Sequence, residues 1–235
     1  MYKKTAHKKI WLLILLLLGI SAQVYSQSSF TRSGINAALF NVQSSLSDDG
    51  SLKDIGGRLG YSIGGVLDVG AVFSVDMTEI ESRSATETNI GIFYGIVLVK
   101  QEDFSPVSLE LSGSYGYSFV DSGYYDDNDL QKEGHGYDLQ LQLMRDFSFA
   151  ESFMLRFGVF GNYRSYNYTI QLTGLETEEE REYSPERETL LTYGGNLTVM
   201  KKNSQGRTFY ISGEPVMNDS MDFSVTIRTG VVFEL

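Results

Sequence analysis

Residues 223–235 read FSVTIRTGVVFEL, and this stretch decides the fold. Its odd-numbered positions are all apolar apart from one threonine. Its even-numbered positions are polar or glycine apart from Val232, and they include Arg228 and Glu234. Because successive side chains of a strand point to opposite faces, this alternation predicts a β-strand with one apolar and one polar face.

The same alternation recurs after residue 26 and predicts an all-β chain. It is clearest in residues 67–77, 108–119, 137–143, 153–163 and 191–199. Val72, Met154 and Phe160 are apolar residues that fall on the polar side of their segments. The predicted strands, about ten in number, lie near residues 29–42, 55–63, 67–79, 87–100, 107–120, 134–147, 153–171, 188–201, 207–216 and 221–235. Eight strands is the alternative count.

The connections between these strands alternate between two kinds. Long connections that are polar and rich in acids are predicted at residues 44–54, 121–133 and 173–187. Short connections are predicted around residues 64–66, 102–106, 149–152 and 203–206. Transmembrane barrels have this asymmetry, with short turns on one side and longer loops on the other. We therefore predict a single antiparallel, up-and-down transmembrane β-barrel.

The composition of the two faces favours lipid over water as the surroundings of this barrel. The polar face is rich in glycine, serine, asparagine and glutamine and has almost no lysine, which suits a narrow lumen better than an exposed surface. Aromatic residues gather near strand ends, as at Tyr115, Tyr117 and Phe119, where membrane barrels carry aromatic girdles. A soluble barrel with its apolar face inward is the alternative.

The first 26 residues predict a cleaved secretory signal peptide. Four lysines within the first nine residues precede an apolar run at Ile10–Ile20, and the expected cleavage lies between Ser26 and Gln27. The apolar run is shorter than the roughly 20 residues that a membrane-spanning helix needs. The mature protein, residues 27–235, is then one barrel domain.

Charge and cysteine content exclude some classes of partner. Four of the 19 basic residues and none of the 30 acidic residues lie in residues 1–26, so the remainder carries a net charge of −15. Phosphate backbones bind to basic surfaces, so we expect no nucleic acid partner. The chain has no cysteine and therefore does not depend on disulfides.

The end of the chain resembles the assembly signal of bacterial outer-membrane β-barrels. That signal has a polar residue, a glycine two positions later, an aromatic residue three positions after the glycine, and a terminal aromatic or hydrophobic residue. Its counterparts are Arg228, Gly230, Phe233 and Leu235, the last standing where an aromatic residue is commoner. With the other patterns, the chain resembles small porin-like outer-membrane β-barrel proteins of Gram-negative bacteria.

This resemblance implies a place in the outer membrane, in contact with its lipid. It also implies recognition by the barrel-assembly machinery during biogenesis. The acidic outer loops are expected to approach the divalent cations that bridge lipopolysaccharide. We expect the barrel to be a monomer.

If the odd positions of residues 223–235 face lipid, the opposite parity of each strand faces the lumen. This parity places nine charged residues inside or near the rims: Arg58, Asp68, Asp76, Glu110, Asp138, Arg156, Arg164, Glu214 and Arg228. A barrel of eight to ten strands has little free interior, so we expect a plug of paired charges. The expected role is non-enzymatic, structural or loop-displaying, with at best a narrow pore. A porin-like channel for small solutes is the alternative.

A hydrolase is a further alternative, and it would depend on His135, the one histidine after residue 26. His135 follows Asp126, Asp127 and Asp129, but a general base needs positioned partners, and we expect a solvated loop histidine without a catalytic role. These aspartates lack the spacing and glycine of a calcium loop, and the acidic stretch 176–182 is expected to be solvated. Neither a metal site nor a cofactor is predicted.

Overall fold

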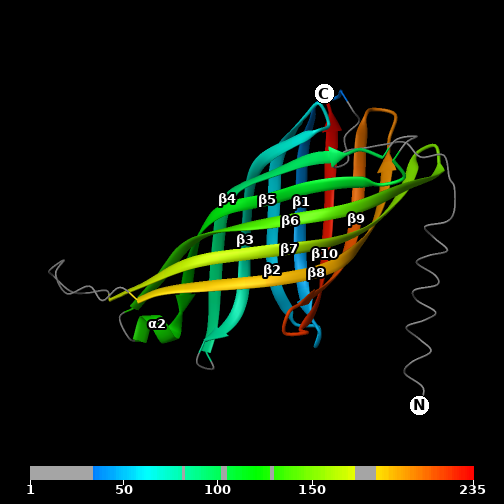
Figure 1. The fold of residues 1–235 in the computed structure, drawn as a ribbon. Helices are drawn as coiled ribbons and strands as arrows, with labels where there is room; N and C mark the ends of the chain where they lie inside the picture. The colour runs from blue at the N-terminus through cyan, green and yellow to red at the C-terminus, as the bar shows by residue number, and fades with distance from the viewer. Residues whose placement is uncertain (1–33, 81–82, 102–104, 128–129, 173–183) are drawn as a thin grey trace, which may run out of the picture.

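The computed structural model describes residues 34–80, 83–101, 105–127, 130–172 and 184–235. Within these residues, ten strands pair in antiparallel order and close into a barrel (Figure 1). The strands are β1 (Ala37–Ser47), β2 (Leu52–Ile63), β3 (Leu67–Ile80), β4 (Arg83–Val99), β5 (Ser108–Ser122), β6 (Leu130–Ala150), β7 (Phe153–Leu172), β8 (Ser184–Lys202), β9 (Arg207–Asn218) and β10 (Phe223–Glu234). A short helix, α2 (Gly123–Asp127), lies between β5 and β6. The predicted all-β, up-and-down barrel is confirmed, whereas the predicted signal peptide, residues 1–26, lies outside the described residues.

The barrel closes because its first and last strands pair with each other. The β1–β10 pair runs from Ala37 opposite Glu234 to Ser47 opposite Ser224. Since the number of strands is even, the start of β1 and the end of β10 lie at the same end of the barrel, here called the terminal end. The opposite end, which carries α2, is called the loop end. No helix of the described residues is long and apolar enough to cross a membrane.

The strands are staggered and unequal in length. Stepping from Asn41 to its register partner on each next strand, through β2 to β7, leads to Glu188 on β8. Stepping the other way around the barrel, through β10 and β9, leads to Met200 on β8. The two residues are 12 apart, and this difference is the stagger of the barrel. Such a stagger tilts the strands by roughly 35–45°. Strands β6, β7 and β8 are the longest and extend the wall at the loop end (Figure 1). Within this extension, β8 pairs with β7 from Ser184 but with β9 only from Thr192.

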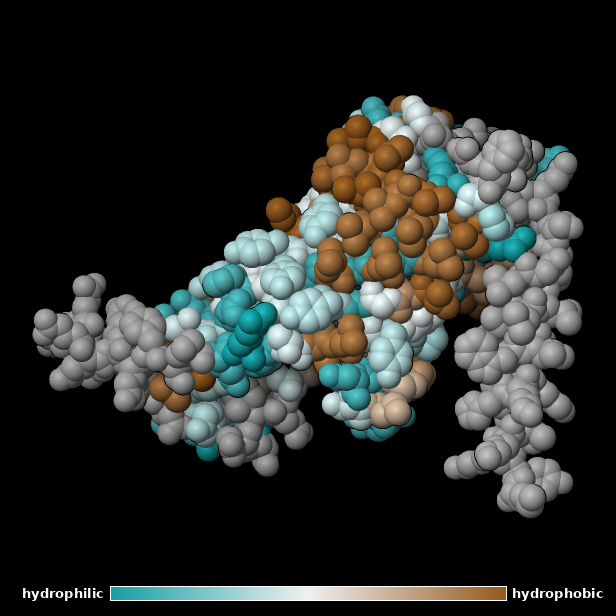
Figure 2. Space-filling model, in the orientation of Figure 1, coloured by the Kyte–Doolittle hydropathy of each residue, from teal (hydrophilic) through white to brown (hydrophobic). Residues whose placement is uncertain are grey.

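The outer face of the barrel is apolar and the inner face is polar. Large apolar side chains stand exposed on the outer face, among them Leu59 at 64%, Ile92 at 63% and Val159 at 60% exposure. Figure 2 shows apolar side chains gathered toward the terminal end, whereas the extended wall at the loop end is polar. Serine, threonine and charged side chains predominate among the buried residues that the structure describes. Water-soluble proteins have the reverse arrangement, so this is the architecture of a transmembrane β-barrel.

Aromatic side chains in the lumen pack over glycines of neighbouring strands. A Cβ atom on Gly194 would lie 2.9 Å from the ring of Phe160, and one on Gly136 would lie 2.5 Å from the ring of Tyr166. The two residues of each pair are also register partners. Phe160 breaks the sequence alternation because it fills the lumen space that a glycine on the adjacent strand leaves open.

The first strand and the connection after it differ from the prediction. Residues 29–33 of the strand predicted over residues 29–42 lie outside the described residues, and the observed strand is β1, Ala37–Ser47. The connection predicted over residues 44–54 shrinks to a turn between Ser47 and Leu52. Serines at the end of β1 were interpreted as loop residues. The Oγ atom of Ser45 instead lies 2.7 Å from the Oγ1 atom of Thr226 on β10, within hydrogen-bond distance.

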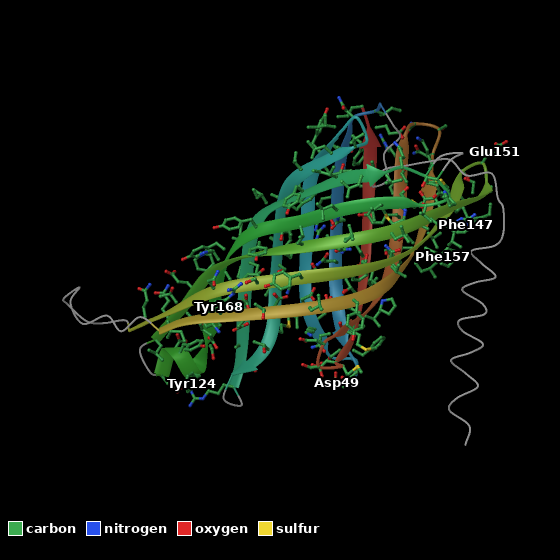
Figure 3. All side chains as sticks on the ribbon, in the orientation of Figure 1. Asp49, Tyr124, Phe147, Glu151, Phe157 and Tyr168 are labelled. Carbon is green, nitrogen blue, oxygen red and sulfur yellow. The ribbon has the colours of Figure 1, made fainter. Side chains whose placement is uncertain are left out.

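Asp49 holds this turn closed (Figure 3). Its carboxylate accepts hydrogen bonds from the hydroxyl of Ser47 at 2.7 Å and from the backbone N–H of Ser51 at 2.9 Å. These hydrogen bonds favour the charged carboxylate and lower the pKa of Asp49 to about 2. A tight turn therefore replaces the long loop that the polar composition predicted.

The glycine–aromatic packing predicts that Gly136→Ala destabilises the barrel. The new Cβ would lie 2.5 Å from Cδ1 of Tyr166 and 2.7 Å from the backbone oxygen of Ser165, so the lumen must rearrange. We expect the free energy of unfolding to fall by about 1–3 kcal/mol, measured by circular dichroism in urea with the protein in detergent micelles. Gly161→Ala is the matched control, because nothing lies within 4 Å of its Cβ position. Equal losses in the two variants would contradict the packing argument.

Candidate functional site in the barrel lumen

The structure distributes the predicted lumen residues over two cavities. Six of them line a cavity of about 90 Å³ inside the barrel: Arg58, Asp68, Glu110, Arg156, Glu214 and Arg228. Asp76 and Arg164 line a second cavity of about 520 Å³ toward the loop end. Asp138 is the register partner of Arg164 and accepts a hydrogen bond from the hydroxyl of Ser114.

Arg156 and Asp146 form a buried ion pair in the lumen. The guanidinium donates from Nε to Oδ1 at 2.7 Å and from its Nη2 atom to Oδ2 at 2.9 Å, and the two side chains are 3% and 4% exposed. Gln101, from the β4–β5 connection, accepts a hydrogen bond from the backbone N–H of Asp146 at 2.8 Å and donates one to its carbonyl at 3.2 Å. The Gln101 amide thus continues the ladder with β6 past Ser108, the first residue of β5, and fixes the position of Asp146.

A second polar network joins β1, β8, β9 and β10. Arg228 lies 3.1 Å from the carboxylate of Glu214 and donates from Nε to Gln43 at 3.3 Å. The Glu214 carboxylate also accepts from the hydroxyl of Ser212, which in turn accepts from Thr198 at 3.0 Å. Both networks satisfy buried charges with partners from neighbouring strands, so they stiffen the wall as they fill the lumen.

An apolar cluster fills the lumen toward the terminal end. It comprises Ala37, Met200, Tyr210 and Val232, with Leu39 and Met154 packed against it. The cavity of about 90 Å³ that remains holds at most a few water molecules. Toward the terminal end, described side chains therefore occupy much of the lumen.

The cavity toward the loop end is wider and ringed by mixed charges. Glu87 accepts hydrogen bonds from the hydroxyls of Ser118 at 2.5 Å and Tyr168 at 2.7 Å. Lys132 packs its Nζ 4.2 Å from the centre of the Tyr168 ring and pairs with Glu186 and Glu188, each at 2.9 Å. Lys132, Glu186 and Glu188 at this mouth thus already have partners of opposite sign, whereas Glu87 is held by hydroxyl donors.

His135 lies on the opposite side of the wall from these carboxylates. Odd-numbered side chains of β6 face outward, and the imidazole of His135 lies beside the ring of Tyr115, with the ring centroids 6.3 Å apart. Asp127 lies in α2 and accepts a hydrogen bond from Arg83. Asp129 and the acidic stretch 176–182 lie outside the described residues. Among the residues that are described, no group of three or more potential ligands could hold a metal ion.

Sequence reasoning did not single out Asp146, Gln101, Glu87 or Lys132. Asp146 has the lumen parity of β6 and is the register partner of Arg156, so a known register would have revealed the pair. Gln101 lies in a connection, where alternation gives no information about direction.

The Arg156–Asp146 pair predicts a large loss of stability in Arg156→Ala, because the Asp146 carboxylate would stay buried without its cation. We expect the free energy of unfolding to fall by about 3–5 kcal/mol in urea titrations, and most of that loss to be recovered when both residues become apolar. Arg83→Ala removes an exposed pair with Asp127 and should cost about 0–1 kcal/mol. Similar losses in Arg156→Ala and Arg83→Ala would contradict the structural role of the buried pair.

Known proteins resemble this chain in structure and not in sequence. No protein-family model matches it, and no curated protein sequence is significantly similar. Similar solved structures include the translocator domain of the autotransporter NalP from Neisseria meningitidis, with 11% identity, 98% of this chain and 96% of that chain covered, and a TM-score of 0.48. They also include the outer membrane protease OmpT from Escherichia coli (10% identity, 86% and 96% covered, TM-score 0.37) and Neisserial surface protein A (9% identity, 86% and 98% covered, TM-score 0.35). The assignment of this chain as a β-barrel of transmembrane architecture rests on its own strand pairing and apolar outer face.

Proposed function

We propose that this protein is an integral outer-membrane β-barrel that catalyses no reaction, keeps its lumen closed and displays its loop end outside the cell. The observation that carries this proposal is the combination of an apolar outer face with a lumen filled by paired charges and apolar side chains. The first part requires lipid around the barrel. The second part supports a lumen that is closed to solutes.

The membrane location is supported by the energetics of the outer face. Exposed apolar area costs roughly 25 cal/mol per Å² in water, and here it covers neighbouring strands without interruption. A closed sheet also satisfies the backbone hydrogen bonds of its strands, which is the condition for spanning hydrocarbon with β-structure. The short turns at the terminal end then face the periplasm, as in other membrane barrels.

The loop end supports a role in display. Strands β6, β7 and β8 carry the wall beyond the apolar region (Figures 1 and 2), and α2 with its acidic residues packs against β4, β5 and β6. Exposed carboxylates there, such as Asp126 and Glu188, are chemically suited to the divalent cations that bridge lipopolysaccharide. We include this lipopolysaccharide contact in the proposal, together with a cleaved signal peptide and a monomeric state.

The proposal predicts that the protein fractionates with outer membranes and is electrically silent. The folded barrel should run at a different mobility from the heated protein in detergent gels, because its closed sheet resists unfolding without heat. In planar bilayers, the refolded protein should give no discrete conductance steps. Steps that change in Glu110→Gln would instead support a porin-like channel. Release of the protein from cells without detergent would contradict the membrane assignment, and an activity lost in His135→Ala would support the hydrolase alternative.

The assembly signal predicts that deletion of Phe233–Leu235 blocks assembly and leaves export intact. The deletion removes the end of β10, where Phe233 pairs with Ala38 of β1, as well as the residues that the machinery would read. We expect the truncated protein to accumulate unfolded in the periplasm, measured by its heat-modifiable mobility and protease sensitivity. Phe223→Ala, at the other end of the same strand, is the control and should assemble. Normal assembly of the truncated protein would remove the basis for the assembly signal.

A further inference from the structure

Three basic side chains lie over phenylalanine rings on the outer face near the terminal end. The Nζ of Lys201 is 5.4 Å from the centre of the Phe153 ring. The guanidinium carbons of Arg207 and Arg145 are 5.8 Å and 5.0 Å from the centres of the rings of Phe233 and Phe147. We call these six residues the basic–aromatic row: Arg145, Phe147, Phe153, Lys201, Arg207 and Phe233.

The row is continuous across one half of the barrel. Register pairs join Arg145 to Phe157, Phe153 to Lys201, Lys201 to Phe209 and Arg207 to Phe233, so cations and rings alternate from β6 to β10. Because the stagger is 12 residues over ten strands, residues at equal height along the barrel axis are offset from register partners by about one residue per strand. A line that starts at Arg145 therefore passes within about three residues of each member of the row. The row runs around the barrel at one level instead of climbing along a strand.

The carboxylates on the same strand ends point the other way. Asp146 binds Arg156 in the lumen, and Glu234 binds Lys202 at 2.5 Å with both side chains largely shielded from solvent. Glu151 lies in the β6–β7 turn, beyond Phe147 and Phe157 (Figure 3). Among the described residues of β6 to β10, the outward-facing charged side chains at this level are thus basic, whereas the exposed acids of α2 and the extended wall lie at the opposite end of the barrel.

We propose that the basic–aromatic row binds the phosphate groups of anionic phospholipids in the membrane leaflet at the terminal end. This proposal rests on the proposed function, which places that leaflet on the periplasmic side. The rings stand at the edge of the apolar outer face, where aromatic side chains meet lipid headgroups. Lysine and arginine lay their apolar stems on such rings and carry the charge outward, to the depth of the phosphates. The row would hold the barrel at a fixed depth and select its neighbouring lipids.

The test measures lipid preference with the full mature protein in mild detergent. Phosphatidylglycerol and phosphatidylcholine of equal chain length are added at equal concentration, and the bound lipids are counted by native mass spectrometry. The wild-type protein should bind phosphatidylglycerol severalfold in preference to phosphatidylcholine. The double variant Lys201→Gln with Arg207→Gln should lose most of this preference, because the attraction of one basic residue to an anionic surface is worth up to about fivefold.

The matched control removes two exposed cations from the loop end, with Lys53→Gln and Arg187→Gln. Its preference should equal that of the wild type, as should that of the charge-preserving variant Lys201→Arg with Arg207→Lys. Equal binding of the two lipids by the wild type, or equal losses in the two neutral double variants, would overturn the proposal. Heat-modifiable mobility is followed in parallel, because a protein that is no membrane barrel would lack it, whereas a barrel without lipid preference would keep it.

Discussion

The pairing of β1 with β10 is the constraint on which the rest of this structure depends. In hydrocarbon, an unpaired backbone N–H or C=O group costs several kcal/mol, so a sheet there has to close into a barrel without free edges. Once the first and last strands meet from Ala37 to Ser47, the parity of each strand is set relative to all the others. A slip of one residue at this seam would turn the apolar residues of a strand into the lumen and its charges into lipid.

The narrow lumen follows from that closure, and the chain fills it in two ways. Where two neighbouring strands both need space, one supplies a ring and the other a glycine, as with Phe160 and Gly194. Where charges have to face inward, partners lie on adjacent strands at register positions, as with Asp146 and Arg156. The interior of the barrel is thus specified mostly by pairs of neighbouring strands, in the way that cross-strand pairs specify a sheet.

Most of the fold could be predicted from the sequence, because strand alternation reports directly on which side chains face out. The boundaries of β3, β7 and β9 were predicted to within two residues. The end of β1 was not, since its serines face the lumen and look like loop residues in the sequence. Within the lumen, Arg58 and Glu110 line the same cavity, but parity alone did not identify the partners of the charged residues. Pairing depends on register, and register depends on turns and bulges such as the one between Val97 and Val99. His135 is different, because it lies inside the predicted strand 134–147 and shares the parity of Tyr137 and Leu139, so the alternation already indicates the outer face on which the structure places it.

Because β8 is longer than β9, part of β8 forms an exposed strand edge in the extended wall. From Ser184 to Leu190, β8 has a register partner on β7, but within the described part of the chain it has none on β9. An unpaired strand edge in water is a template on which another chain can add a strand, the first step toward aggregation. Along this edge Pro185 is followed by Glu186, Arg187 and Glu188, and proline and charged residues discourage such addition. The same few residues that place carboxylates at the mouth of the lumen thereby help to keep neighbouring copies apart on a crowded surface.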